Sequence, residues 1–140
     1  MFPSPENLER LTVADIHTLI AAKIPEGLSI DYKRDCYTEV REWCKDALAF
    51  ANGVGGCIVL GVEEVDSLPV AIPGVRSGEV EAALGRMENG LRDQTEPRLR
   101  MHCKRLAVDR DREVVVVGIT RSSAGPHRRN DGKWYKRSAS

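Results

Sequence analysis

The chain has 140 residues, of which 41% are hydrophobic and 30% charged, with 21 basic and 21 acidic side chains. This composition indicates a compact folded domain and excludes an intrinsically disordered chain. No apolar run approaches the ~20 residues of a membrane-spanning helix, and the first residues lack the pattern of a secretion signal. We expect a single cytoplasmic domain over residues 1–140, with 1–11 as an N-terminal extension.

The first half of the chain predicts two helices and two strands. Thr12 and Asp15 have the spacing of a capping box, followed by an apolar stripe. Thr38 is the expected cap of a second helix that ends at Asn52-Gly53. The segment "LSIDYK" alternates like a strand, and "GGCIVLGV" reads as a strand buried on both faces. The expected elements are helices over 12–23 and 38–52 and strands over 28–33 and 55–62.

The second half predicts one long helix and two longer strands. Apolar residues recur at helical spacing between Ser77 and Gln94. Two strands over 98–108 and 113–120 are joined at "DRDR", and "NDG" is a turn signal before "KWYKR". Residues 69–74 form either an edge strand or a loop. The predicted fold class is α+β, a mixed, mostly antiparallel sheet with about three helices packed on it.

Acidic residues surround the strand in "EGLSIDYKRD". Asp31 and Lys33 are two positions apart and share a face of the strand, an arrangement found in metal-dependent nucleases. Glu26 can join them if the chain turns at Gly27. Glu63 and Glu64 follow the buried strand and offer a third carboxylate. The same residues could instead be a weak, solvated surface pair on an ordinary strand.

The pattern as a whole resembles the Schlafen AlbA-type domain family. The resemblance rests on "EGLSIDYK", a helix ending in "AFANGVGG", the strand "CIVLGVEE", and the later helix, strands and "DGKWYKR" in the same order, over about residues 10–140. In that family Tyr32 stands where Phe is commoner. Asp31 and Glu64 stand where glutamate and aspartate, respectively, are commoner, so that all three acids are kept.

The resemblance implies a site and an activity. Glu26, Asp31 and Glu64 would hold Mg²⁺ or Mn²⁺ with Lys33 beside them, as in a Schlafen-like endoribonuclease that cuts structured RNA such as tRNA. It also leaves open a non-catalytic RNA- or DNA-binding domain of a transcriptional regulator or defence protein, or an assembly domain. Because the Schlafen groove is built from two such lobes, we expect a homodimer or larger assembly.

The glycines in "NGVGGC" follow a helix and precede a strand. In a phosphate-binding loop the order is reversed, and a Gly-Lys-Ser/Thr is present. We therefore predict a helix end and a tight turn here. The four cysteines contain no C-x-x-C pair, which argues against a zinc knuckle and favours free thiols.

Two basic segments are candidate nucleic-acid contacts. Residues 121–140 carry six basic side chains and one acid, giving +5, so residues 1–120 carry −5. Alternating cations in 98–104 would share one strand face, and aromatic side chains interleave the cations near the end. The expected contacts are Arg98, Arg100, His102, Lys104, Arg128, Arg129, Lys133, Trp134, Lys136 and Arg137. The alternative is solvation of these cations and core packing of the tryptophan.

Overall fold

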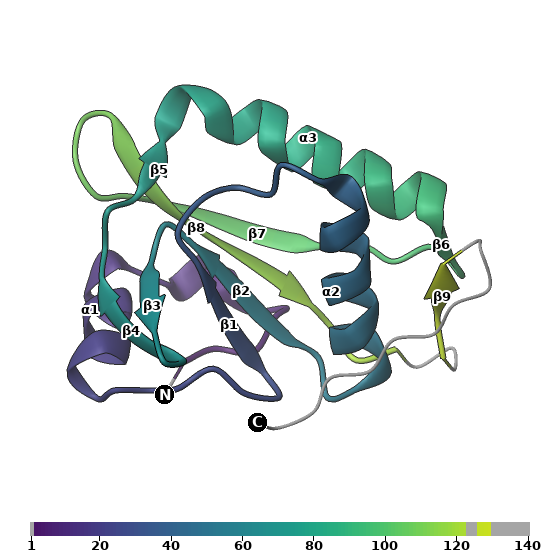
Figure 1. The fold of residues 1–140 in the computed structure, drawn as a ribbon, viewed down its shortest axis with the longest axis horizontal. Coiled ribbons are helices and arrows are strands. Elements are labelled where there is room, and N and C mark those ends of the chain that lie inside the picture. Colours follow the sequence, from purple (N-terminus) through teal and green to yellow (C-terminus); the bar gives the residue numbers. More distant parts are fainter. Residues whose placement is uncertain (1, 123–125, 130–140) are drawn as a thin grey trace.

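A mixed five-stranded sheet forms the centre of the computed structural model, which describes residues 2–122 and 126–129 (Figure 1). The edge strand β1 runs parallel to β2, β2 and β5 pair antiparallel with one side of β8, and β7 pairs antiparallel with its other side. The predicted α+β class is therefore confirmed. The strands are β1 (Ile30–Lys33), β2 (Gly56–Leu60), β5 (Val75–Arg76), β7 (His102–Ala107) and β8 (Arg112–Ile119).

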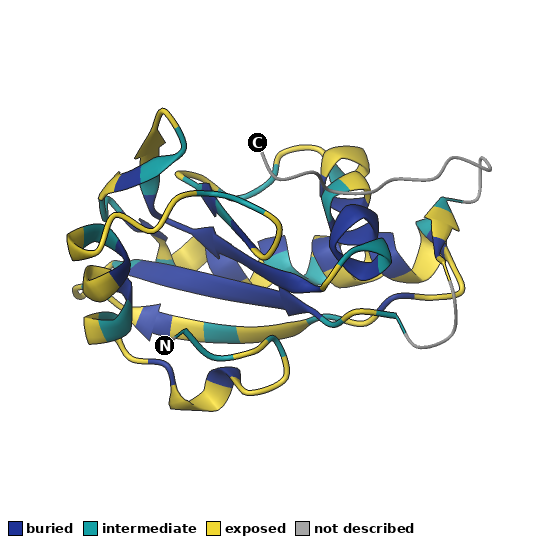
Figure 2. Ribbon diagram, turned by 90° about the horizontal axis from the view of Figure 1, so that it is seen from below, coloured by how far each residue is buried: buried dark blue, intermediate teal, exposed yellow. Residues whose placement is uncertain are grey.

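The inner strands β2 and β8 are buried on both faces, and their alternate residues belong to two separate cores. In β2, Ile58 and Leu60 pack against helices on one face, and Cys57 and Val59 pack on the other. Figure 2 shows the resulting band of buried strands between partly exposed helices. This explains the continuous apolar runs of β2 and β8, since a strand covered on both faces has no solvent side.

Helices α2 (Val40–Asn52) and α3 (Ser77–Gln94) cover one face, and α1 (Val13–Ala21) with a short 3-10 helix (Leu8–Arg10) covers the other. Leu8 and Leu11 are buried there, so the predicted N-terminal extension packs on the sheet. None of the helices among the described residues is both long and apolar enough to cross a membrane.

The helix boundaries agree with the sequence patterns, with one correction. α3 has the predicted bounds, and the backbone N–H of Thr12 donates to Asp15 Oδ2 at 2.9 Å, as expected for the capping box of α1. The predicted Thr38 cap of α2 is wrong, because α2 begins at Val40 with Glu39 at its N-cap. Thr38 and Tyr37 lie instead in the connection between β1 and α2.

A hairpin that the sequence patterns did not predict follows β2. Strands β3 (Glu63–Val65) and β4 (Leu68–Ala71) pair antiparallel around Asp66 and Ser67, which have φ of 52° and 69°. Two central residues with positive φ are typical of a tight hairpin turn, and aspartate tolerates this conformation better than most residues. The acids Glu63 and Glu64 therefore begin a new strand instead of ending β2.

The predicted strand over 98–108 is shorter in the structure. β7 begins at His102, and Arg98 and Arg100 lie in the segment before it. There Leu99 is buried in the core beneath α2 and α3. The expected common strand face of four cations is therefore wrong, and only His102 and Lys104 share one. The Lys104 ammonium donates to the Glu9 carbonyl oxygen at 3.0 Å.

The glycine pair before β2 is needed for close packing. Gly55 and Gly56 have φ of +78° and +154°. A Cβ on Gly56 would collide with the Ser29 carbonyl oxygen and lie 2.6 Å from Phe50 Cε1, so the chain entering β2 fits only without a side chain. The predicted helix end and tight turn are confirmed, and this contact also sets β2 against the start of β1.

We expect Gly56→Ala to destabilise the fold by about 2–4 kcal/mol, because backbone and a buried ring must move to admit a methyl group. The matched control is Gly85→Ala in α3, where nothing lies within 4 Å of the new Cβ. That substitution should raise stability by about 0.5–1 kcal/mol. Urea denaturation measures both, and equal stabilities of the two variants would contradict the close packing at Gly56.

Candidate functional site

A hollow of about 500 Å³ lies beside the edge strand β1. It brings together the three predicted acids from three segments of the chain, namely Glu26 before β1, Asp31 within it, and Glu64 in β3. Lys33 also lies in its wall. The site residues that sequence analysis singled out around β1 are therefore neighbours in the fold. The complete lining is Glu26, Asp31, Tyr32, Lys33, Arg34, Glu63 and Glu64.

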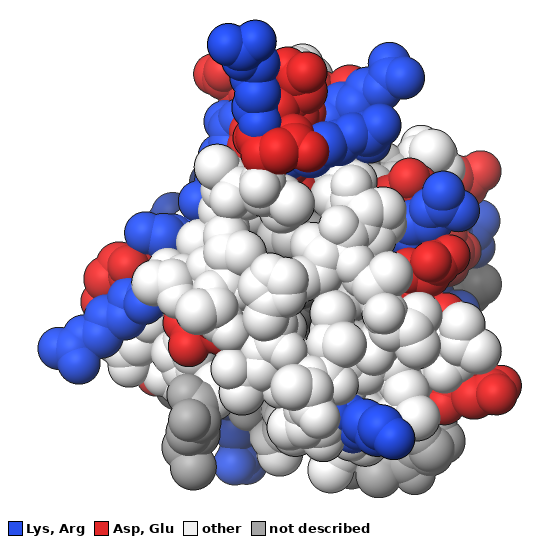
Figure 3. Space-filling view, turned by 90° about the vertical axis from the view of Figure 1, so that its left-hand side faces the viewer, with Lys and Arg blue, Asp and Glu red and all other residues white. Residues whose placement is uncertain are grey.

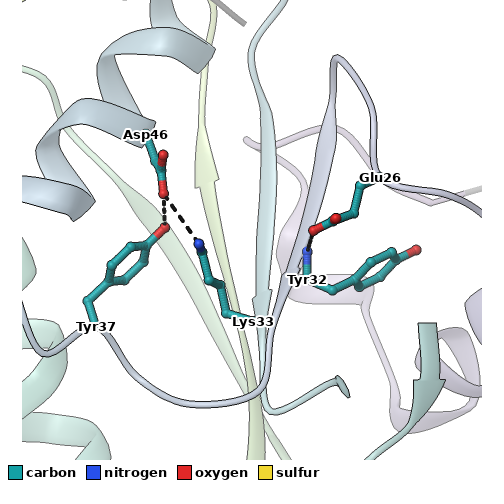
Figure 4. A network of polar contacts seen from close by, with 5 residues as sticks. All are labelled: Glu26, Tyr32, Lys33, Tyr37 and Asp46. Carbon is teal, nitrogen blue, oxygen red and sulfur yellow. Dashed lines mark hydrogen bonds and ion pairs between the residues drawn. The ribbon is translucent and has the colours of Figure 1, made fainter. Parts of the chain in front are cut away.

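Glu26 is held beside β1, at the edge of the sheet. The Gly27 N–H donates to the Ile30 carbonyl oxygen at 3.0 Å, which closes the expected turn. This turn returns the Glu26 side chain to the strand, where Oε2 accepts the Tyr32 N–H at 3.0 Å (Figure 4). The Glu26 N–H donates to the Ser67 carbonyl oxygen at 2.8 Å, so the same residue also fixes the β3–β4 turn.

The surroundings of Glu26 disfavour the charged form of its carboxyl group. Burial, a hydrogen bond with Asp31 and the negative charges of Asp31 and Glu64 raise the pKa of Glu26 to about 7, although the Tyr32 N–H opposes the shift. Glu26 therefore carries a proton into the neutral range. A group of crowded carboxylates of this kind is stabilised by any cation that binds among them.

Tyr32 has a structural role under this site. Its ring is buried, and its hydroxyl donates to the Ile24 carbonyl oxygen at 2.7 Å. Burial, together with the charge of Glu26, raises the pKa of Tyr32 to about 12, so that the hydroxyl stays protonated as a donor. The hydroxyl that distinguishes Tyr32 from phenylalanine thus ties β1 to the connection that precedes it.

The donor chemistry of the hollow suits a hard divalent cation, which prefers several carboxylate oxygens. As the side chains lie, Glu64 Oε2 accepts the Ser67 N–H at 2.9 Å and Glu26 accepts the Tyr32 N–H. Within residues 2–122 and 126–129, no three His, Cys, Asp or Glu side chains are placed to hold one metal ion. The three acids thus share a hollow without converging on a single point.

Lys33 turns away from Glu26. Its Nζ lies 3.8 Å from Asp46 Oδ2, and the Tyr37 hydroxyl donates to the same oxygen at 2.6 Å (Figure 4). Tyr37 and Asp46 were not predicted as site residues. In the sequence Asp46 stands out only as a charged residue at the margin of the apolar stripe of α2, and this position by itself indicates no function.

The predicted basic contacts fall into separate places. Arg128 and Arg129 form strand β9, which pairs with β6 (Thr95–Glu96). Arg128 Nη2 lies 3.7 Å from Glu96 Oε2, and Arg129 Nη2 donates to Gln94 Oε1 at 3.3 Å. Both arginines therefore also make contacts that hold β9 against the end of α3 and β6. Four further predicted contacts lie outside the described residues: Lys133, Trp134, Lys136 and Arg137.

Charge is unevenly spread over the described surface. Figure 3 looks at the side of the molecule where α1 and β4 lie, and uncharged residues fill its centre with charged residues at the margins. Phosphate groups are attracted by clustered cations, which this side lacks at its centre. The centre of this side therefore offers little electrostatic attraction to the phosphates of a nucleic acid.

The fold and the hollow define an α+β domain with an acidic site at the edge of a mixed sheet. The family model described as "Schlafen, AlbA_2" matches residues 26–140, which include every element from β1 onward. The chain therefore belongs to the Schlafen AlbA_2 family and is a nucleic-acid-related domain. A comparison with curated proteins gave no significant match.

Solved structures show the same fold at low identity. The crystal structure of the DIP2311 protein from Corynebacterium diphtheriae matches with a TM-score of 0.52 and 12% sequence identity. The match covers 91% of this chain and 28% of that chain. The chain thus spans less than a third of the length of this solved structure, and at this identity the likeness concerns the fold alone.

The raised pKa of Glu26 predicts a pH-dependent stability. In the unfolded chain this carboxyl titrates near 4.5, and in the fold near 7, so the folded state binds the proton more tightly. Stability should be highest below pH 4.5 as far as Glu26 is concerned, and should fall as pH rises to about 7. With allowance for solvent screening, we expect a loss of about 1 kcal/mol.

Glu26→Gln keeps an acceptor for the Tyr32 N–H and removes the titration. Urea denaturation of both proteins at several pH values between 4.5 and 8, in EDTA, measures the difference. The wild-type protein should lose stability relative to Glu26→Gln across this range. A constant difference between the two proteins at every pH would contradict the assigned pKa.

Proposed function

We propose that this domain is a divalent-metal-dependent endoribonuclease that hydrolyses phosphodiester bonds in structured RNA such as tRNA. One observation carries the proposal: Glu26, Asp31 and Glu64, which come from separate segments, line one hollow with Lys33 in its wall. Membership of the Schlafen AlbA_2 family supports a nucleic acid as the ligand.

Each side chain has a separate task in this proposal. Glu26, Asp31 and Glu64 would hold Mg²⁺ or Mn²⁺ through their carboxylate oxygens. The bound cation would lower the pKa of a water molecule and offset negative charge on the phosphate. Lys33 would neutralise a phosphate oxygen at the edge of the hollow. Glu26, whose pKa is raised by burial and by its acidic neighbours, would lose its proton when the cation binds.

The basic residues outside the hollow would place the RNA by its backbone. Structured RNA is recognised largely through shape, phosphate and 2′-hydroxyl contacts, for which scattered arginine and lysine side chains suffice. We also propose that two copies of this lobe associate, as a homodimer or larger assembly, to enclose a duplex. The mass of the protein in solution tests this association, and a strictly monomeric mass would overturn it.

A second candidate is a non-catalytic RNA- or DNA-binding domain of a transcriptional regulator or defence protein. One observation favours it. Glu26 and Glu64 each accept a backbone N–H, and three ligating side chains do not converge in the described part of the chain. In this reading the acids stabilise the edge of β1 and the β3–β4 turn, and the cations alone bind the polyanion.

Cleavage assays separate the two functions. We expect the purified protein to cut tRNA with Mn²⁺ or Mg²⁺ and not with EDTA. Glu26→Ala, Asp31→Ala and Glu64→Ala should each reduce the cleavage rate at least a hundredfold, because each removes a cation ligand. Glu81→Ala, an exposed acid of α3 away from the hollow, serves as the control and should cut like the wild type.

Two further measurements make the result decisive. Mn²⁺ should raise the melting temperature of the wild-type protein and not that of Glu26→Ala, because only the native site binds the cation. A DNA duplex of similar length tests the choice of RNA. RNA binding without metal-dependent cuts, and without a Mn²⁺ effect on melting, would contradict the nuclease and support the binding domain.

Backbone-led binding also predicts a steep salt dependence. The slope of log K against log[salt] should become shallower by roughly 1.5 in a double variant Arg98→Ala/Arg100→Ala, if each arginine contacts one phosphate. Lys104→Ala should change the slope less, because its ammonium is engaged by the Glu9 carbonyl oxygen. An unchanged slope in the double variant would remove the segment before β7 from the interface.

A further inference from the structure

We propose that Tyr37 and Asp46 are positioning residues that hold the Lys33 ammonium as the phosphate contact of the site. The inference rests on the proposed binding of nucleic acid at this hollow. It adds two residues to the site and names what they do, which is to fix where a backbone phosphate lies relative to the acids.

The contacts converge on a single carboxylate oxygen. Asp46 Oδ2 accepts the Tyr37 hydroxyl at 2.6 Å and lies 3.8 Å from Lys33 Nζ. The same ammonium lies 5.5 Å from the centroid of the Tyr37 ring, within the range of a cation–π contact. Tyr37 therefore orients the carboxylate and also flanks the cation, so Lys33 is guided from two directions (Figure 4).

This support is anchored in the core. The Tyr37 ring packs against Trp43 at 5.4 Å between centroids, with the planes tilted by 54°. Trp43 is fully buried, and its Nε1–H donates to the Met87 carbonyl oxygen of α3 at 3.0 Å. A series of contacts thus connects α3, through Trp43 and Tyr37, to the Asp46 carboxylate near Lys33.

Lys33 stands between two hollows. Besides the acidic hollow, a second one of about 430 Å³ lies between the end of β1 and the start of α2. Lys33 and Arg34 line both hollows, and the Arg34 guanidinium lies 3.9 Å from Glu63 Oε1. In this proposal a phosphate group that contacts Lys33 would place its neighbouring ester bond beside the acids. The second hollow is lined by Lys33, Arg34, Asp35, Cys36, Tyr37, Thr38, Glu39 and Glu42.

The ion pair between Lys33 and Asp46 contributes little to stability, which favours a role in binding. The Lys33 and Asp46 side chains are 40% and 23% exposed and their charged atoms are 3.8 Å apart. Pairs of this kind typically contribute less than about 1 kcal/mol. Holding the ammonium in place has a larger effect on the affinity for a phosphate ligand, because the lysine side chain loses its conformational freedom before the ligand binds. Variants of the network should therefore fold and still bind RNA more weakly.

Asp46 and Glu42 provide a matched test, because both are acids on α2, one turn apart. Fluorescence anisotropy of a labelled tRNA transcript in EDTA measures binding without cleavage. If Asp46 were only a negative charge near the phosphate, neutralising it would tighten binding. As a positioning residue, Asp46→Asn should weaken binding about fivefold. Glu42→Gln, which does not contact Lys33 in the structure, should bind the RNA slightly more tightly.

Tyr37→Phe removes one hydroxyl without changing any charge. It keeps the ring on Trp43 and should weaken binding about threefold, because Asp46 Oδ2 loses its donor. Asp46→Glu keeps a carboxylate and should recover part of the affinity lost in Asp46→Asn. Equal melting temperatures of the wild type and the variants confirm that the fold is retained.

A double-mutant cycle with Lys33→Met shows whether the effect passes through the lysine. Lys33→Met alone should weaken binding by about five- to tenfold. In the Lys33→Met protein, Tyr37→Phe and Asp46→Asn should cause no further loss, because there is no ammonium to hold. A merely structural role of Tyr37 would give the same loss in both proteins and would overturn the inference.

The outcomes also separate this inference from the proposed function. If the wild-type protein binds neither tRNA nor DNA, the proposed function fails and the inference fails with it. If the wild type binds and Lys33→Met weakens binding, the nucleic-acid site stands. Should Asp46→Asn then behave like Glu42→Gln, with Tyr37→Phe binding like the wild type, only the positioning role is overturned.

Discussion

The hydrogen bond from the Tyr32 N–H to the Glu26 carboxylate is the contact on which the site depends. Among the described residues β1 is an edge strand, and no neighbouring strand pairs with the donors on its outer side. The Glu26 carboxylate accepts one of these donors in place of a strand, and this brings the carboxylate next to Asp31. The Glu26 N–H also fixes the β3–β4 turn by donating to the Ser67 carbonyl oxygen. The bond that completes the sheet edge therefore also concentrates negative charge there.

The two functions proposed for this domain differ in how the negative charge of the carboxylates beside β1 is balanced. A nuclease needs the carboxylates to be shared by a cation, which would favour the charged form of Glu26 that burial and the neighbouring acids now disfavour. A binding domain needs no cation among the acids, because protonation of Glu26 reduces the charge and the N–H groups of Tyr32 and Ser67 donate hydrogen bonds to Glu26 and Glu64.

Much of the fold could be predicted because it follows from local patterns. α3 carries a strong helical periodicity, the buried strands β2 and β8 are continuous apolar runs, and the turn at Gly27 was expected from residue type and strand parity. The β3–β4 hairpin was missed, since its turn uses Asp66 and Ser67 in a conformation more often associated with glycine. The start of β7 was missed because Leu99 packs in the core outside any strand.

The amino-acid sequence by itself determined the class of fold, the family, and the residues that meet beside β1, because these depend on periodicity and on motif order. Only the tertiary structure decided where each charged side chain points. Lys33 shares a strand face with Asp31, and yet its ammonium lies against Asp46 of α2, thirteen residues later in the chain. Strand parity places a side chain on a face, whereas the partner it finds there depends on how the helix packs across the sheet.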